Sequence, residues 1–112
     1  MRRAELKIED CGRTESAVIL AVAGELDMST IDALAGRIGT ELERPVQSLT
    51  IDLGDLAFMD STGLRLLIEL NDRALREGWR LALVTPRHEA ASRVLTITGA
   101  EAALPFQSEN GR

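Results

Sequence analysis

Alternating and continuous apolar residues predict two strands at the start of the chain. Leu6 and Ile8 alternate with charged residues, which indicates a short, half-exposed strand. Residues 11–13 then have the composition of a turn. Residues 17–23 form a continuous apolar run rich in β-branched side chains, a pattern typical of a strand covered on both faces, and we expect Gly24 to end it.

A helical repeat comes next, followed by a second alternating segment. Ser29 precedes a stripe of apolar residues at helical spacing, namely Ile31, Leu34, Ala35, Ile38 and Leu42. Gly36 and Gly39 weaken this helix by about 1 kcal/mol each relative to alanine, and we interpret them as sites where the helix approaches the sheet closely. Residues 49–53 alternate between apolar and polar side chains and predict the next strand.

The second half of the chain predicts two more helices and at least one more strand. The stripe of the helix after residue 63 comprises Leu64, Leu67, Ile68, Asn71 and Leu75, widened by Leu70 and Ala74. Gly78 is the expected stop of that helix, and residues 80–85 form the strand that follows. Pro86 is expected to start a third helix, which Gly99 ends. Residues 103–106 suit a short final strand or an extended tail, and the polar residues 107–112 are expected to fray.

The order of these elements predicts an α/β fold. Strands separated by helices form parallel pairs joined by right-handed crossovers, whereas the first two strands, joined by a turn, pair antiparallel. We therefore expect one domain spanning residues 1–112, with a core from about residue 5 to residue 106. Its mixed sheet has four to five strands, with about three helices packed on it.

Composition and charge narrow the class of protein. The chain has 112 residues, 45% of them hydrophobic, which suits one domain with one core. Its net charge of −5 argues against nucleic acid or an acidic membrane as the main partner. The longest apolar run, residues 17–23, is far shorter than the roughly 20 residues that span a membrane. Cys11 is the only cysteine and no apolar signal core is present, so we expect a cytoplasmic protein without membrane insertion.

The titratable and nucleophilic residues form no catalytic or metal-binding pattern. A serine nucleophile needs a base and an orienting acid, and the only histidine, His88, is expected in solvent at the start of the last helix. One histidine and one cysteine, far apart, argue against a zinc site. Aspartyl-phosphate chemistry at Asp60 lacks an acidic pair and a lysine in the later strands, because Lys7 is the only lysine. We therefore predict no enzyme, no cofactor and no metal.

Two segments that follow strands carry the candidate functional residues. Function in open sheets of this type collects at the carboxyl ends of strands, an edge that residues 24–30 and 58–63 both reach if their strands are parallel. The residues brought close together would be Asp27, Ser29, Asp60, Ser61 and Thr62.

From the residues alone, the hydroxyls at these junctions have two interpretations. Ser29 and Ser61, or Thr62 in place of Ser61, can cap the helices that follow, with Asp27 and Asp60 adding negative charge at the positive helix ends. The N-terminal end of a helix also stabilises a negatively charged phosphate group. A serine at that position can therefore be a phosphate acceptor. Capping is the commoner role.

Three large apolar residues are candidates for either the core or a surface. We expect Phe58 to plug the core beneath the junction. Met59 suits an adaptable core filler and a docking surface equally. Trp79 follows a glycine at the start of a strand, where we expect burial under the helix layer.

The string from Phe58 to Leu64, Phe-Met-Asp-Ser-Thr-Gly-Leu, resembles the signature of the STAS domain family. It is preceded by Leu-Thr-Ile-Asp-Leu at residues 49–53 and by Gly-Glu-Leu-Asp at residues 24–27, in the order and spacing of that family. The similarity extends over nearly the whole chain, from about Leu6 to Phe106. The branch it resembles most is the bacterial anti-sigma factor antagonists.

The resemblance implies a regulated binding module in the control of transcription. In that branch the serine after the aspartate is phosphorylated by a serine kinase that is also the anti-sigma factor, which makes Ser61 the implied acceptor here. The unmodified form binds the anti-sigma factor and frees a sigma factor, and a phosphatase resets the switch. The residues implied to contact the partner are Asp27, Ser29, Met59, Asp60, Thr62, Gly63 and Arg65.

A second interpretation of the same resemblance is a structural one. STAS domains also serve as subunits of lipid-transport complexes and stress-signalling scaffolds, in which Ser61 or Thr62 would be a contact that is never modified.

Overall fold

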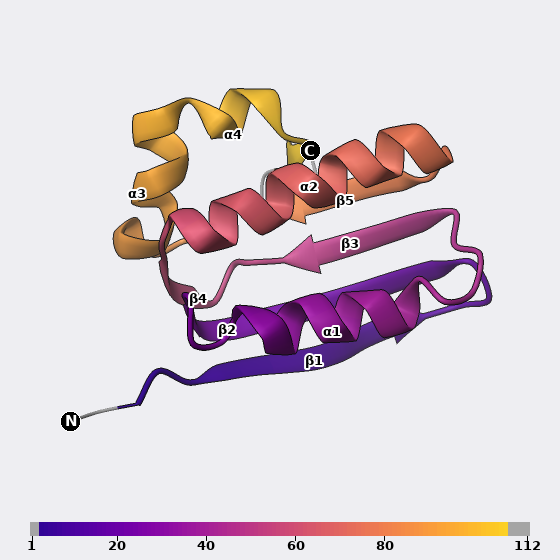
Figure 1. The fold of residues 1–112 in the computed structure, drawn as a ribbon, viewed down its shortest axis with the longest axis horizontal. Helices are drawn as coiled ribbons and strands as arrows, with labels where there is room; N and C mark the ends of the chain where they lie inside the picture. The colour runs from indigo at the N-terminus through magenta and orange to yellow at the C-terminus, as the bar shows by residue number, and fades with distance from the viewer. Residues whose placement is uncertain (1–2, 108–112) are drawn as a thin grey trace.

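Six strands form one mixed sheet in the computed structural model, which describes residues 3–107 (Figure 1). The strands are β1 (Leu6–Arg13), β2 (Ala17–Leu26), β3 (Ser48–Asp52), β4 (Leu56–Met59), β5 (Arg80–Val84) and β6 (Phe106–Gln107). Their order is β1-β2-β3-β5-β6, with β4 paired to β2 beyond the end of β3. The pair β1–β2 is antiparallel and the other pairs are parallel, as predicted.

Within residues 3–107, four helices connect and cover these strands: α1 (Ile31–Glu41), α2 (Ser61–Glu77), α3 (Glu89–Thr98) and α4 (Ala100–Ala103). Figure 1 shows α1 and α2 running along the sheet beside each other, and both contribute to one apolar core with the strands beneath them. The predicted α/β class is confirmed. The two short elements β4 and α4 add to the predicted count of strands and helices.

Strand β2 is covered on one face rather than on both, which corrects the sequence prediction. Val18, Leu20 and Val22 are buried under the helices, whereas Ile19 on the opposite face is 40% exposed. The apolar run misleads because the less covered face carries small apolar residues, including Ala21 and Ala23, that a one-sided strand tolerates.

The ends of β1 and β2 also differ from the prediction. Residues 11–13 do not form a turn but continue β1, with an irregularity between Asp10 and Gly12, and the turn lies at residues 14–16. Gly24 does not end β2, which runs on to Leu26. At Gly24 the backbone has a φ of 103°, and a Cβ would lie 2.3 Å from the carbonyl oxygen of Glu5. The glycine therefore permits a close approach of β1 rather than a strand stop.

Glycines mark the observed helix ends as predicted, whereas the proline expected to start a helix does not. Gly78 and Gly99 have φ values of 81° and 75° and end α2 and α3, as predicted. Helix α3 begins at Glu89 with His88 as its N-cap, three residues after the predicted start at Pro86. The predicted close approach at Gly36 and Gly39 is wrong, because a Cβ at either position would meet nothing within 4 Å.

The buried face of α2 is rotated from the predicted one. Leu64, Leu67, Leu70 and Ala74 are buried, whereas Ile68 is 49% exposed and Leu75 is 75% exposed. At the C-terminal end, the short final strand that was one of the two predicted alternatives is confirmed as β6, although it begins at Phe106, and α4 occupies residues 100–103 before it. The fraying predicted for residues 107–112 is wrong at Gln107, which pairs with Val84 in β6, and residues 108–112 lie outside the described residues.

Candidate functional site

Two loops leave the carboxyl ends of β2 and β4 side by side. The strands pair in parallel with Leu26 opposite Met59, and the backbone N–H of Asp60 donates to the carbonyl oxygen of Leu26 at 3.3 Å. Residues 27–30 and residues 60–63 therefore begin at the same edge of the sheet. The predicted neighbourhood of these two junctions is confirmed at the level of the backbone.

The start of α2 is capped by Asp60. Its backbone is extended, and its Oδ1 accepts hydrogen bonds from the N–H groups of Thr62 and Gly63 at 2.9 and 3.4 Å. A side chain at this position satisfies the otherwise unpaired donors of the first turn. Capping by Ser61 or Thr62, the commoner interpretation from sequence, is therefore wrong for this helix.

Ser61 is the first residue of α2 and its side chain is exposed. Within residues 3–107, its hydroxyl takes part in no hydrogen bond, because the capping bonds belong to Asp60. Thr62, the next hydroxyl, is half-buried. Ser61 thus presents an uncommitted oxygen at the positive end of a 17-residue helix, where an anion is favoured.

The neighbouring loop is held by a local hydrogen-bond network. The Asp27 carboxylate accepts from the N–H of Ser29 at 2.8 Å and from the Ser29 hydroxyl at 2.7 Å, which holds the pKa of Asp27 below its usual range. Thr30 is buried, donates to the carbonyl oxygen of Glu25 at 2.8 Å and accepts from the N–H of Asp27 at 3.1 Å. Thr30 takes the N-cap position of α1, so the predicted cap at Ser29 is wrong.

Met59 and Gly63 lie beneath the surface that the two loops form. Met59 is 2% exposed, and a Cβ on Gly63 would lie 2.6 Å from Met59 Cγ and 2.9 Å from Leu26 Cδ2. The sequence left Met59 equally suited to the core and to a docking surface, and the family resemblance implied that Met59 and Gly63 contact a partner. Their burial rules out that role and makes them supports that let α2 start close to the sheet.

Phe58, in contrast, is on the surface, which overturns its expected role as a core plug. Its side chain is 40% exposed, because an irregularity in the pairing of β4 with β2 at Ala57 breaks the alternation that starts at the buried Leu56, so that Met59 and not Phe58 takes the next inward position. Trp79 is half-buried against the core, in agreement with its predicted place, and its indole N–H donates to Glu77 at 2.9 Å.

Exposed residues of mixed chemistry lie in the two segments that meet at the Ser61 edge of the sheet. Met28, in the loop after β2, is 78% exposed, and Arg65 on the first turns of α2 is exposed with a 3.7 Å ion pair to Glu69. Met28 was not singled out from the sequence. The signal that could have found it is a large apolar side chain between Asp27 and Ser29, in a loop with no apolar periodicity.

Over the described part of the chain, no three or more His, Cys, Asp or Glu residues are grouped so as to hold a metal ion. His88 is exposed at the start of α3. No helix among residues 3–107 is long and apolar enough to cross a membrane.

Comparison with known proteins finds one matching family and several similar structures. The sequence model of the family described as "Mlab, STAS domain" matches residues 10–105. The crystal structure of an anti-sigma factor antagonist from Mycobacterium paratuberculosis is 26% identical, with a TM-score of 0.72 over 91% of this chain and 85% of that one.

Two structures of SpoIIAA show the same fold at lower identity. The unphosphorylated form of this anti-sigma factor antagonist is 21% identical, with a TM-score of 0.73 over 93% of this chain and 87% of that one. The phosphorylated form, from Bacillus, is 21% identical, with a TM-score of 0.67 over 93% and 90% of the two chains. At this identity the two comparisons bear on the fold alone.

Proposed function

Because this chain belongs to the STAS domain family, we propose that it is a binding module whose contact with a partner is switched by phosphorylation of Ser61. The partner is an anti-sigma factor with serine kinase activity. Unmodified, the domain binds that factor and frees a bacterial sigma factor; phosphorylated, it does not, and a phosphatase resets it. The similarity to an anti-sigma factor antagonist at 26% identity supports this role.

The observation that carries the proposal is the free hydroxyl of Ser61. An acceptor must reach a kinase active site and must not be needed for folding. Ser61 is exposed, and Asp60 rather than Ser61 supplies the capping bonds of α2. Modification of Ser61 therefore leaves the helix cap intact.

The switch acts through local charge. A phosphoserine adds about −1.5 to −2 charges and three acceptor oxygens next to Asp60, with the Asp27 loop alongside. The positive end of α2 stabilises these charges inside the domain, whereas a partner surface matched to a neutral hydroxyl is repelled. Couplings of this kind amount to about 1–3 kcal/mol.

The exposed and half-exposed residues around the acceptor form the contact surface. Met28 and Phe58 supply its apolar part, and the other members are Asp27, Ser29, Asp60, Thr62 and Arg65. Such a mixture of apolar anchors and polar rim is usual for a regulated interface. The module itself catalyses nothing and acts in the cytoplasm.

The test is to incubate the chain with the candidate kinase and ATP and to measure its intact mass. One added phosphate is expected, located on Ser61 by peptide mapping. Ser61→Ala should abolish it, while Thr96→Ala, a control that removes an exposed hydroxyl of α3 outside the contact surface, should keep it. A phosphate that persists in Ser61→Ala, or no phosphate on the unaltered chain, would contradict the proposal.

A second candidate function remains because the matching family is described by the name Mlab and not as an anti-sigma factor antagonist. In this second function, the domain is an unmodified subunit of a larger assembly, such as a lipid-transport complex. Ser61 then contacts a neighbouring subunit and is not phosphorylated. The neighbouring genes distinguish the two candidate functions. Genes for a kinase-like regulator and a sigma factor would favour the first function, and genes for transporter subunits would favour the second. Co-purification with transporter subunits and no phosphate on Ser61 would favour the second.

A further inference from the structure

Strand β1 forms one edge of the sheet, and its outer side is open. It is the first strand in the order β1-β2-β3-β5-β6, and among residues 3–107 β2 is the only strand that pairs with it (Figure 1). The N–H of Glu25 donates to the carbonyl oxygen of Glu5 at 2.8 Å, which fixes the directions of the backbone groups along β1. Because these directions alternate, the odd-numbered residues from 5 to 9 turn their N–H and C=O groups to β2, and the even-numbered residues from 4 to 8 turn theirs outward.

The side chains along this edge form a charged row on one face and an apolar row on the other. The charged row is exposed and comprises Arg3, Glu5, Lys7 and Glu9. An ion pair of 3.2 Å joins two of its members, Lys7 and Glu9, which confirms that they share a face. The apolar row is half-buried on the face that the helices cover, and comprises Ala4, Leu6 and Ile8. Its burial stays incomplete because β1 has a neighbouring strand on one side only.

The charged row is complementary to itself about Leu6. Glu5 and Lys7 are the members next to Leu6 on its two sides, and they carry opposite charges. Arg3 and Glu9 are the next members outward, and they are again opposite in charge. A second β1 strand, antiparallel to the first and related to it by a two-fold axis at Leu6, would therefore meet an opposite charge at each position of this row.

We propose that β1 pairs in this way with β1 of a second copy of this chain, so that the two sheets join into one across a two-fold axis at Leu6. Glu5 of each copy then lies opposite Lys7 of the other, at a pair without backbone hydrogen bonds, where facing side chains are closest. On the other face Leu6 meets Leu6, and the apolar row of each copy covers that of the other. One strand from each copy gives a small interface, so the dimer is reversible.

The other possible registers of the same pair fit less well. An axis at Lys7 or at Glu9 would place that residue opposite its own copy, with like charges facing each other. An axis at Ile8 would place the charged Asp10 opposite Leu6. It would also bring the irregularity that follows Asp10 in β1 into the pairing. The register at Leu6 uses only the regular part of the strand.

The pairing closes as a dimer because the other edge of the sheet cannot take part in it. Within the described residues that edge is β6, which consists of Phe106–Gln107 and is too short to receive β1. Charged side chains along an edge also oppose pairing with strands that lack matching charges. The charged row therefore selects its own copy over an arbitrary strand.

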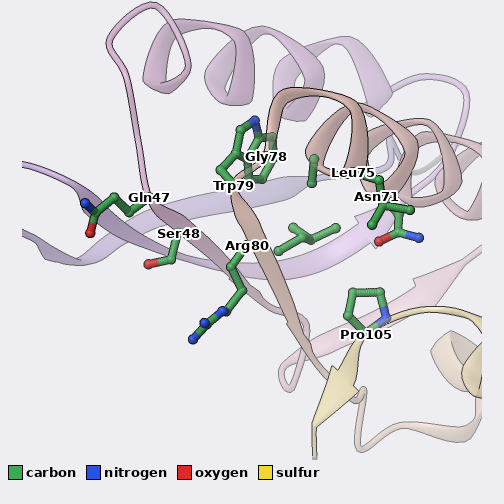
Figure 2. Close-up of a pocket in the computed structure, with 10 residues that line it drawn as sticks. Gln47, Ser48, Asn71, Leu75, Gly78, Trp79, Arg80 and Pro105 are labelled. Carbon is green, nitrogen blue, oxygen red and sulfur yellow. The ribbon is translucent and has the colours of Figure 1, made fainter.

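A cavity of about 580 Å³ beside Trp79 offers no comparable match to a partner. Its lining includes Asn71, Leu75 and Arg80. Figure 2 shows the Arg80 side chain pointing away from Asn71 and Leu75. This direction follows from the alternation of Arg80 with the core-facing Leu81 along β5. The charge of Arg80 and the apolar wall therefore do not act on one ligand together.

Sedimentation equilibrium over a range of concentrations tests the dimer. The unaltered chain is expected to convert reversibly from monomer to dimer between about 10 µM and 1 mM. Lys7→Glu should raise the dissociation constant by about tenfold or more, because the symmetry creates two contacts between like charges at once. Glu5→Lys in the same chain as Lys7→Glu exchanges the two charges and should restore dimer formation. Arg93→Glu is the control, because it makes the same change of net charge at an exposed position of α3 and should leave the dimer unchanged.

A disulfide tests the position of the axis. In a Cys11→Ser background, which removes the only cysteine, Leu6→Cys places two thiols across the axis with Cα atoms about 5.5 Å apart, within disulfide range. A cross-linked dimer is therefore expected under a mild oxidant. Ile8→Cys in the same background should give none, because Ile8 faces Ala4 of the other copy and lies far from its own equivalent.

Four results would overturn the proposal. They are a chain that stays monomeric up to about 1 mM, a dimer that Lys7→Glu and Arg93→Glu weaken equally, no recovery when the two charges are exchanged, and a disulfide through Ile8→Cys but not through Leu6→Cys.

Discussion

At the start of α2, the capping bond and the free hydroxyl belong to different residues. Asp60 satisfies the helix N–H groups, and Ser61 stands next to it without a structural bond among the described residues. This separation lets a modification change the surface charge while the helix start stays in place.

Two substitutions distinguish these roles by their effect on stability. Ser61→Glu should abolish binding of the anti-sigma factor while changing the free energy of unfolding by less than about 0.5 kcal/mol, because a surface carboxylate at a helix start is tolerated. Asp60→Ala should reduce that free energy by about 0.5–2 kcal/mol through loss of the cap. Chemical denaturation and a pull-down measure the two effects. A large destabilisation by Ser61→Glu would show that Ser61 is structural after all.

Gly63 is the residue on which the close packing of the site depends. Gly63→Ala would place a Cβ 2.6 Å from Met59 Cγ and 2.9 Å from Leu26 Cδ2, and should destabilise the fold by about 1–3 kcal/mol. In a Met59→Ala background, Gly63→Ala should cost less, because that change removes Met59 Cγ and Sδ, which are among the atoms in conflict. Equilibrium denaturation of the single and double variants tests the coupling. Equal, additive losses would indicate that the two residues do not share one packing site.

At the scale of elements, α1 is tied to β1 by a buried carboxylate. Glu41, at the end of α1, is 5% exposed and accepts hydrogen bonds from Arg13 of β1 and from Arg37 of its own helix. Burial by itself raises the pKa of Glu41, but the two arginines outweigh it and hold the pKa below its usual range.

This arrangement gives stability an acid dependence with a defined sign. Since the pKa of Glu41 is lower in the folded state than in the unfolded chain, its contribution is full above the unfolded value of about 4.3 and is lost as pH falls through the folded value. Glu41→Gln should cost about 1–3 kcal/mol at neutral pH, with the difference from the unaltered protein narrowing in acid. Denaturation from pH 7 to pH 3 measures it. A difference that does not change with pH would contradict the assignment.

Helix α1 also offers a gain in stability. A Cβ at Gly36 would meet nothing within 4 Å, so Gly36→Ala should stabilise the protein by about 0.5–1 kcal/mol through helix propensity. Gly78→Ala is the contrasting change, because the φ of 81° at Gly78 strains any other residue and should make the substitution destabilising. Thermal melts of both variants decide the matter. A loss of stability in Gly36→Ala would mean that the gain in helix propensity is outweighed by a lost contact of α1.

At the scale of the whole molecule, periodicity predicts the elements better than their orientation. The order of the main elements along the chain, the parallel pairing and the glycine stops of α2 and α3 follow from the sequence pattern. The face of α2 does not, because two adjacent apolar stripes run along it and only the sheet decides which is buried. The exchange of Phe58 and Met59 has the same cause, since a shift of one residue in a strand reverses the side that points inward.

Prediction of the candidate site from the sequence has a similar limit. The motif identifies where the loops meet, and pairing of β2 with β4 confirms it, but neither the cap nor the support beneath it can be read from residue types. Asp60, Ser61 and Thr62 are all good capping residues, so their local preferences do not discriminate. Backbone geometry selects Asp60.

The negative net charge of the molecule leads to a prediction about how salt affects partner binding. The chain carries −5, and phosphorylation would bring it to about −7, with the new charge beside Asp60. If repulsion alone opposes docking, salt should restore part of the binding of the phosphorylated form, because the Debye length falls from about 10 Å at 0.1 M to about 3 Å at 1 M. Binding of the Ser61→Ala variant, which adds no charge, should lack this gain with salt. Isothermal titration at several salt concentrations measures both. If phosphorylation reduces the affinity for the partner equally at all salt concentrations, the phosphate blocks the partner sterically or reshapes the loops.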